Sequence, residues 1–222
     1  MDNNVYNTFV EVIEKLKMDE NVKSIIHVGS SKNKIYEDSN SINDIDLFII
    51  VEKQEANQIR KIKNINNIEF DLNFISIEGS RHFIEEKTYF FLKIKDGNIL
   101  YDENNIGRGI LSLCEEKYKE GPDKIPLEDK QFQVNQLLSD ISRLSNKDIY
   151  EEFEYDFLIY MYLYNIIKTY YIINDIWVPK DKKLLKSLKN QNIELYKLIC
   201  DVKGKNKYEK LIKVTDYAFG NL

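Results

Sequence analysis

The stretch HVGSSKNKIYEDSNSINDIDLFII, residues 27–50, decides the fold. An apolar strand, Val22–Val28, ends at Gly29, and a second apolar run begins at Asp44 and Asp46. Successive side chains of a strand point to opposite faces, so the two carboxylates project from the same side, about 6 to 7 Å apart. Carboxylates held side by side repel each other unless a cation lies between them. The stretch therefore predicts a cation site at the start of a buried strand.

A third acid follows on the next predicted strand, Ile68–Ile75, where large apolar residues alternate with polar ones. If this strand pairs beside the second, Asp71 approaches Asp44 and Asp46 and completes a cluster of three carboxylates. Hard oxygen ligands without nearby His or Cys suit Mg²⁺ or Mn²⁺ better than Zn²⁺. Two simpler interpretations stay open, because Glu69 shares the face of Asp71 and all these acids could line a solvent-exposed face.

The turn after the first strand contains candidate phosphate ligands. Glycine at position 29 lets the backbone approach a ligand closely. The Ser30 hydroxyl and the backbone N–H groups that follow, including that of Ser31, could donate hydrogen bonds to phosphate oxygens. We therefore predict Gly29, Ser30 and Ser31 as nucleotide-binding residues.

The order HVGSS, then DIDLFII, then IEFDLNFI resembles the nucleotidyltransferase superfamily, the DNA polymerase beta-like enzymes. The family pattern is an apolar strand ending in Gly-Ser or Gly-Gly, then Asp-x-Asp, then a third acid on a later strand. The resemblance implies that Gly29 and Ser30 hold the triphosphate and that Asp44 and Asp46 ligate two Mg²⁺ ions. Asp71 would join the catalytic ion and help to activate the acceptor hydroxyl.

The implied reaction is transfer of a nucleoside monophosphate from an NTP, with ATP as the expected nucleotide, and release of pyrophosphate. The implied fold is α+β, a small mixed sheet flanked by helices followed by an all-α bundle. The residue pattern changes after Gly121-Pro122, because no strand alternation follows and helical periodicity begins. We therefore expect a catalytic domain over residues 1–121 and a helical bundle over residues 122–222.

The helical half is similar in layout to the C-terminal bundles of aminoglycoside and lincosamide nucleotidyltransferases. In that group the bundle helps to bind the acceptor and often builds a dimer. The resemblance therefore implies a small hydroxylated acceptor, a link to antibiotic resistance and a homodimer as a hypothesis to test. The acids at the start of the long helix within residues 149–173 are candidates for a general base or a contact to a cationic acceptor, although acids are also favoured there by the helix dipole.

Hydrophobic periodicity places the other elements. An opening helix is expected over residues 5–18, a helix over 78–87 and five helices after residue 126, and residues 54–63 have a helical composition. The segment FFLKIKDGNILYD, residues 90–102, predicts a β-hairpin with Asp96-Gly97 as its turn.

Composition sets limits on the class of protein. The chain has 222 residues, a formal net charge of −5 and two cysteines distant in sequence. Cys114 and Cys200 predict neither a disulfide framework nor a zinc knuckle. The first residues lack the basic and apolar regions of a secretory signal, and the apolar run from Phe157 is too short to span a membrane. We expect a cytoplasmic protein.

The net charge argues against a general nucleic-acid binder. Residues 180–213, however, contain eleven lysines and four acids. An alternative function is therefore binding or modification of RNA, such as tRNA, through this segment, although a solvated helix face has the same pattern. A further alternative is an antitoxin-like enzyme that nucleotidylates another protein.

Overall fold

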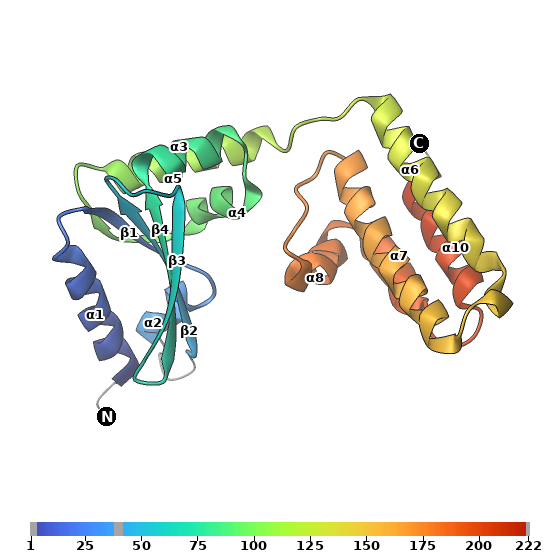
Figure 1. The fold of residues 1–222 in the computed structure, drawn as a ribbon, viewed down its shortest axis with the longest axis horizontal. Helices are drawn as coiled ribbons and strands as arrows, with labels where there is room; N and C mark the ends of the chain where they lie inside the picture. Colours follow the sequence, from blue (N-terminus) through green and yellow to red (C-terminus); the bar gives the residue numbers. More distant parts are fainter. Residues whose placement is uncertain (1–3, 38–41, 221–222) are drawn as a thin grey trace. The chain divides into compact units, whose positions relative to one another are not determined.

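The computed structural model describes residues 4–37 and 42–220, and the chain divides into two compact units, Met1–Glu120 and Gly121–Leu222. The first unit contains a mixed five-stranded sheet with helices (Figure 1). The second, within its described residues, is helical throughout. These two features confirm the predicted α+β fold class.

The sheet of the N-terminal unit has the strand order β3-β4-β2-β1-β5. β2 and β4 run parallel, and the other neighbouring pairs are antiparallel. The strands are β1 (Val22–Val28), β2 (Asp44–Val51), β3 (Gln58–Ile65), β4 (Ile68–Ser76) and β5 (Asn98–Asp102). β2 and β4, which carry the predicted acids, are therefore direct neighbours near the middle of the sheet.

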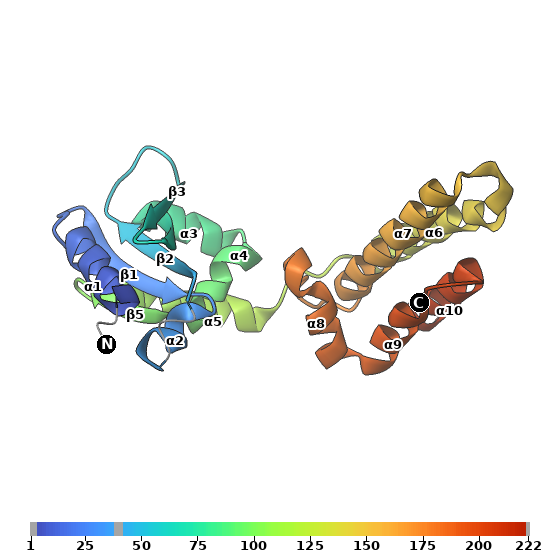
Figure 2. The ribbon, with the colours of Figure 1, turned by 90° about the horizontal axis from the view of Figure 1, so that it is seen from below.

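Both faces of the sheet are covered by helices (Figures 1 and 2). The amphipathic helix α1 (Asn4–Lys17) packs Phe9 and Ile13 against one face, where Leu47 and Phe70 are also buried. The opposite face is covered by α3 (Ile77–Glu85), α4 (Tyr89–Leu92) and α5 (Ile106–Glu120). β2 is buried from Leu47 to its end, whereas Asp44 is exposed and Asp46 half-buried. The helices thus leave the acids Asp44 and Asp46 at least partly accessible, whereas Ile45 between them is buried.

Two expectations for this unit were wrong. The segment 54–63 is not helical, because its second half begins the edge strand β3. The segment 90–102 is not a hairpin, because its first half forms α4 and a 3₁₀ turn at Lys93–Asp96. Only its second half is a strand, β5, which pairs with β1 and so finds its partner far away in the sequence. The helix α5 was not expected from the sequence.

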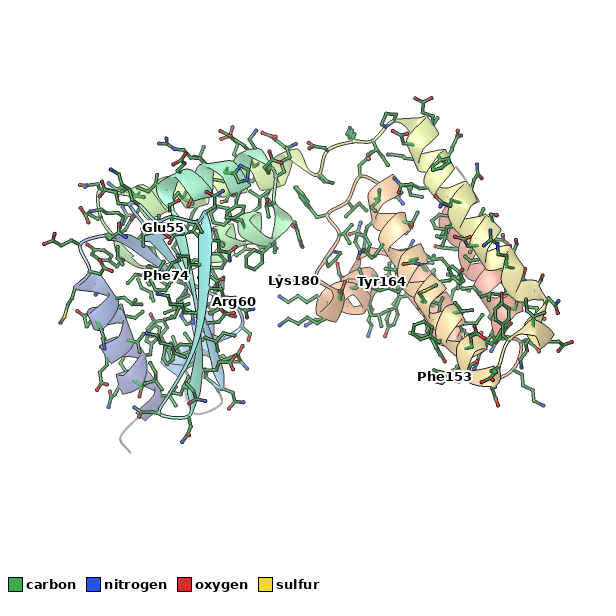
Figure 3. The ribbon with its side chains drawn as sticks, viewed as in Figure 1. Glu55, Arg60, Phe74, Phe153, Tyr164 and Lys180 are labelled. Carbon is green, nitrogen blue, oxygen red and sulfur yellow. The ribbon has the colours of Figure 1, made fainter. Side chains whose placement is uncertain are left out.

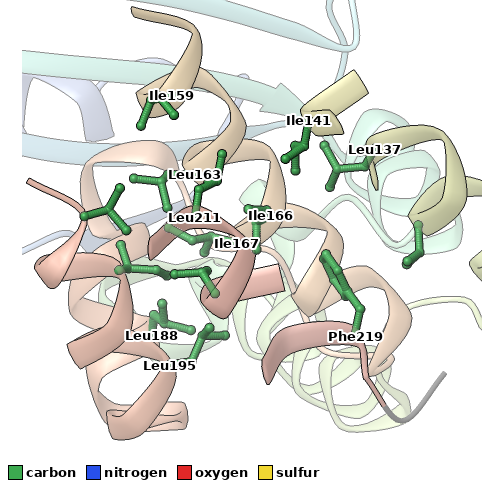
Figure 4. Packing of buried hydrophobic residues seen from close by; sticks show 14 of the residues in the cluster. Leu137, Ile141, Ile159, Leu163, Ile166, Ile167, Leu188, Leu195, Leu211 and Phe219 are labelled. Atoms are coloured by element: carbon green, nitrogen blue, oxygen red, sulfur yellow. The ribbon is translucent and has the colours of Figure 1, made fainter. Parts of the chain in front are cut away.

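The C-terminal unit packs its helices around one apolar core (Figure 4). Its longest helix contributes residues spaced three and four apart, including Ile159, Leu163 and Ile166, which are at most 5% exposed. The helices are α6 (Leu127–Ser142), α7 (Glu152–Ile173), α8 (Asp181–Gln191), α9 (Ile193–Asp201) and α10 (Lys207–Phe219). Five α-helices were expected after residue 126, and the described part of the chain contains these five.

None of the helices within residues 4–37 and 42–220 combines the length and the apolar character needed to cross a bilayer. This includes α7, in which the apolar run from Phe157 lies. Its residues Ile159 and Ile166 are instead buried within the helical unit.

Candidate active site

The first half of the candidate site is formed where β1 ends beside the start of β2. Val28 pairs with Asp46 across the two antiparallel strands, and Gly29 follows with a φ of +79°. A Cβ atom at this glycine would lie 2.2 Å from Oδ2 of Asp46. The Asp46 carboxylate therefore lies directly against the glycine backbone, and a larger residue at position 29 would displace this carboxylate.

The second half lies on β4. In the parallel register Asp44 is opposite Glu69, and Asp46 is opposite Asp71. Directly opposed residues of paired strands project from the same face, so this end of the sheet carries two rows of acids. Asp46 and Asp71 are half-buried, whereas the outer pair is exposed. The register thus places Asp71 directly beside Asp46, and Asp44 two residues away on the same face.

Asp71 is held by three N–H groups from β3 and β4. Arg60 donates from Nε to Oδ1 and from its terminal nitrogen Nη2 to Oδ2, both at 2.8 Å. Asn73 donates from Nδ2 to Oδ1 at 3.1 Å and itself accepts a bond of 2.9 Å from Gln58. The two bonds from Arg60 form a bidentate pair, which is the strongest form of an Arg–carboxylate interaction. The orientation of the Asp71 carboxylate is therefore fixed from two strands.

Arg60 projects from the edge strand β3 (Figure 3), and the sequence analysis did not identify it. Its pKa is raised, first by the hydrogen bonds to Asp71 and then by the negative charge of that residue, with smaller effects of Asp46 and Glu69. The guanidinium therefore interacts with acids of both rows. A signal for it exists only once residues 58–65 are assigned as a strand, because the register then places Arg60 opposite Asn73.

The serines of the turn have different surroundings. Ser30 is exposed, whereas Ser31, the first residue of α2 (Ser31–Glu37), is buried. Oγ of Ser31 lies 3.1 Å from Nε2 of His27, whose ring packs against Phe9 at 5.3 Å between ring centroids. Burial, with a smaller effect of Lys32, lowers the pKa of His27 to about 4. His27 is thus a neutral core residue beneath the turn, and Ser30 keeps its hydroxyl accessible.

The acids suit a hard divalent ion only in part. Carboxylate oxygens are the ligands that Mg²⁺ prefers. Within residues 4–37 and 42–220, however, no three His, Cys, Asp or Glu side chains are placed to hold one ion together. Asp71 already binds Arg60 through both oxygens. The donor chemistry of Asp44 and Asp46 suits such an ion, whereas Asp71 would have to give up its bonds to Arg60 before it could join them.

The acids that open α7 do not act as one group. Asp156 accepts a 2.6 Å bond from Lys207 on α10 and so helps to join two helices of the unit. Glu152 and Glu154 are exposed in the first turn. A role for either in contacting an acceptor remains a hypothesis from the sequence.

Comparison with known proteins supports the fold. No protein-family model matches the chain, and no curated protein matches it in sequence. The structure is similar to the crystal structure of a nucleotidyltransferase-like protein from Exiguobacterium sibiricum 255-15, with a TM-score of 0.51 and 10% sequence identity. The match covers 96% of this chain and 73% of that one. The similarity is one of fold, and the chain has a nucleotidyltransferase-like fold.

Proposed function

We propose that the protein transfers a nucleoside monophosphate from an NTP, with ATP as the expected donor, to a hydroxyl group and releases pyrophosphate. The observation that supports this proposal most strongly is the contact between Gly29 and Asp46, with Asp71 beside Asp46 on the parallel neighbour β4. A close turn for phosphates next to paired carboxylates is the arrangement that such a reaction requires.

Each residue has a distinct role in this proposal. Asp44 and Asp46 would hold two Mg²⁺ ions, and Asp71 would be a further ligand of one of them, the catalytic ion. Bound Mg²⁺ would neutralise the charge of the triphosphate and of the leaving pyrophosphate. Gly29 and the Ser30 hydroxyl would orient the phosphates, whereas Ser31, whose hydroxyl bonds to His27, would contribute through its backbone.

We further propose that the C-terminal helical unit binds the acceptor, a small hydroxylated molecule of the aminoglycoside or lincosamide type, and forms a homodimer. This rests on its resemblance in layout to the bundles of antibiotic nucleotidyltransferases. A shallow, open surface depression of about 280 Å³ on α6 and α7 is lined by residues such as Gln136, Asp140 and Asn165, which offer hydrogen-bonding groups to such a molecule.

The test is pyrophosphate release from each of the four NTPs with Mg²⁺, in the presence of aminoglycosides, lincosamides or RNA. We expect release with one acceptor class and a loss on the order of 100-fold in Asp46→Asn. Glu69→Gln is the matched control, because it removes a carboxylate from the same face and should retain activity. If Glu69→Gln abolishes release and Asp71→Asn does not, the third acid is wrongly assigned. Unchanged binding of metal and NTP in the triple variant Asp44→Asn, Asp46→Asn, Asp71→Asn would overturn the site.

A second candidate function is action on RNA, favoured by the exposed lysines of α8. These are Lys182, Lys183, Lys186 and Lys189. RNA binding that weakens steeply as salt rises, and that is reduced by replacing these four lysines with glutamine, would support it. Absence of RNA binding at low salt would exclude it and favour a small acceptor.

A further inference from the structure

The ion pair between Arg60 and Asp71 occupies a carboxylate that the proposed function assigns to a metal ion. We propose that Arg60 and a divalent cation compete for Asp71, so that Arg60 sets the metal affinity of the site. This inference rests on the proposed function, because it concerns the same three aspartates. Arg60 is a positioning residue here, since it acts on the metal through Asp71.

Most of the lone-pair positions of the Asp71 carboxylate already accept hydrogen bonds. A carboxylate offers about four lone-pair positions. Oδ1 accepts from Arg60 and Asn73, and Oδ2 accepts from Arg60. One position on Oδ2 therefore remains, directly beside a guanidinium. An ion bound at this position of Oδ2 would lie beside the positively charged guanidinium of Arg60. The two positive charges repel, so the Arg60–Asp71 ion pair and the bound ion destabilise each other.

Exposure indicates which partner moves. The Arg60 side chain is 58% exposed and that of Asp71 is 17% exposed. Arg60 stands on an edge strand, so its guanidinium can turn into water and remain hydrated. Asp71 is kept in place by Asn73, which is buried and bonded to Gln58. We therefore expect metal binding to displace Arg60 and to leave the Asp71 carboxylate in position.

The next residue of the strand provides a matched control. Lys61 pairs with Leu72 and thus lies on the opposite face of the sheet, where its Nζ stands 5.0 Å from the Phe74 ring centroid. Lys61→Gln removes one positive charge from the same strand without touching Asp71. It therefore reports the general effect of net charge on metal binding.

The experiment is calorimetric titration of the full chain with Mn²⁺ in the absence of nucleotide. We expect Arg60→Gln to bind Mn²⁺ about tenfold more tightly than the native chain, and Lys61→Gln to differ by less than about twofold. In the Asp71→Asn background, Arg60→Gln should lose most of its gain, because the two effects act through one pair. Equal affinities of Arg60→Gln, Lys61→Gln and the native chain would overturn the proposal.

A spectroscopic measurement tests the displacement directly. The Nε–H resonance of Arg60 in a ¹⁵N correlation spectrum should move, on saturation with Mg²⁺, toward its position in the Asp71→Asn variant. A resonance that stays unchanged while the ion binds would show that the pair persists, and would overturn the proposal. The two proposals fail in different ways. If no variant binds a divalent ion, the proposed function fails as well, whereas binding that depends on Asp46 but not on Arg60 defeats this inference alone.

Discussion

The two halves of the carboxylate site are built by different means. On the β1–β2 side, Oδ2 of Asp46 lies 2.2 Å from the place that a Cβ at position 29 would take, so the contact requires glycine's lack of a side chain. On the β3–β4 side, the position of Asp71 depends on added groups, the guanidinium of Arg60 and the amide of Asn73. The backbone at Gly29 has less freedom to move than the exposed Arg60 side chain on its edge strand. We therefore call the β1–β2 side, with its backbone contact, the fixed half of the site, and the β3–β4 side, with its exposed ion pair, the adjustable half.

The sharpest test of the fixed half is Gly29→Ala. The new Cβ would overlap Oδ2 of Asp46, and that carboxylate is the end of a side chain that can swing away. We therefore expect metal–nucleotide affinity to fall by about 10- to 100-fold. Stability should fall by only about 1 to 2 kcal/mol, the cost of left-handed backbone for alanine. Calorimetry with MgATP and urea unfolding measure the two quantities.

Gly204→Ala is the matched control for that substitution. Gly204 has a similar φ of +69°, and nothing lies within 4 Å of the Cβ it would gain. It should therefore show the same backbone cost and no loss of nucleotide affinity. If both variants bind MgATP as the native chain does, the contact between Gly29 and Asp46 has no role in binding.

The turn also rests on His27, and this support should depend on pH. The folded-state pKa of about 4 lies below the ordinary value of 6.5, because the ring is buried. The unfolded chain thus binds a proton first as the pH falls. The neutral His27 ring therefore makes its full contribution to the free energy of unfolding above pH 6.5, and this contribution is lost as the pH falls from 6.5 to 4. Between pH 7 and 4.5 we expect this residue to lower the free energy of unfolding by about 2 to 3 kcal/mol.

Urea unfolding at pH 7 and pH 4.5 measures that loss. In His27→Gln, which cannot titrate, the difference between the two pH values should be smaller by this amount. His82→Gln removes an exposed imidazole from α3 and is the control, so it should keep the pH dependence of the native chain. An equal pH dependence in His27→Gln and the native chain would contradict the prediction.

Sequence reasoning succeeded where burial imposes a pattern. The apolar alternation around Asp44, Asp46 and Asp71 identified β2 and β4, and their parallel pairing then brings the acids together. It failed at β3, because that edge strand is largely exposed and carries no alternation. The expectation of a helix over residues 54–63 rested on composition alone, which does not show an exposed edge strand. The segment therefore predicted the wrong element.

The missed strand explains the missed site residue. Arg60 can be recognised as a site residue only from the register of β3 against β4. No short sequence motif indicates that these two segments pair. The predicted hairpin at residues 90–102 failed for a related reason. Gly97 has a φ of −76°, which differs from the positive φ of primed hairpin turns, and β5 pairs with β1 instead. Pairing between distant segments is what local patterns do not encode.

The smallest effect expected here tests whether the adjustable half depends on charge or on its neutral support. Asn73→Ala removes the amide that donates to Asp71 and accepts from Gln58. Because Asn73 is buried, we expect stability to fall by about 1 to 2 kcal/mol in urea unfolding. Mn²⁺ affinity should change by less than about twofold, since Arg60 still neutralises Asp71. Gln58→Ala removes only the outer bond and should lower stability less. If Asn73→Ala instead tightens Mn²⁺ binding as much as Arg60→Gln does, the neutral amide restrains the carboxylate as strongly as the charge of Arg60 does, and the adjustable half does not depend on charge alone.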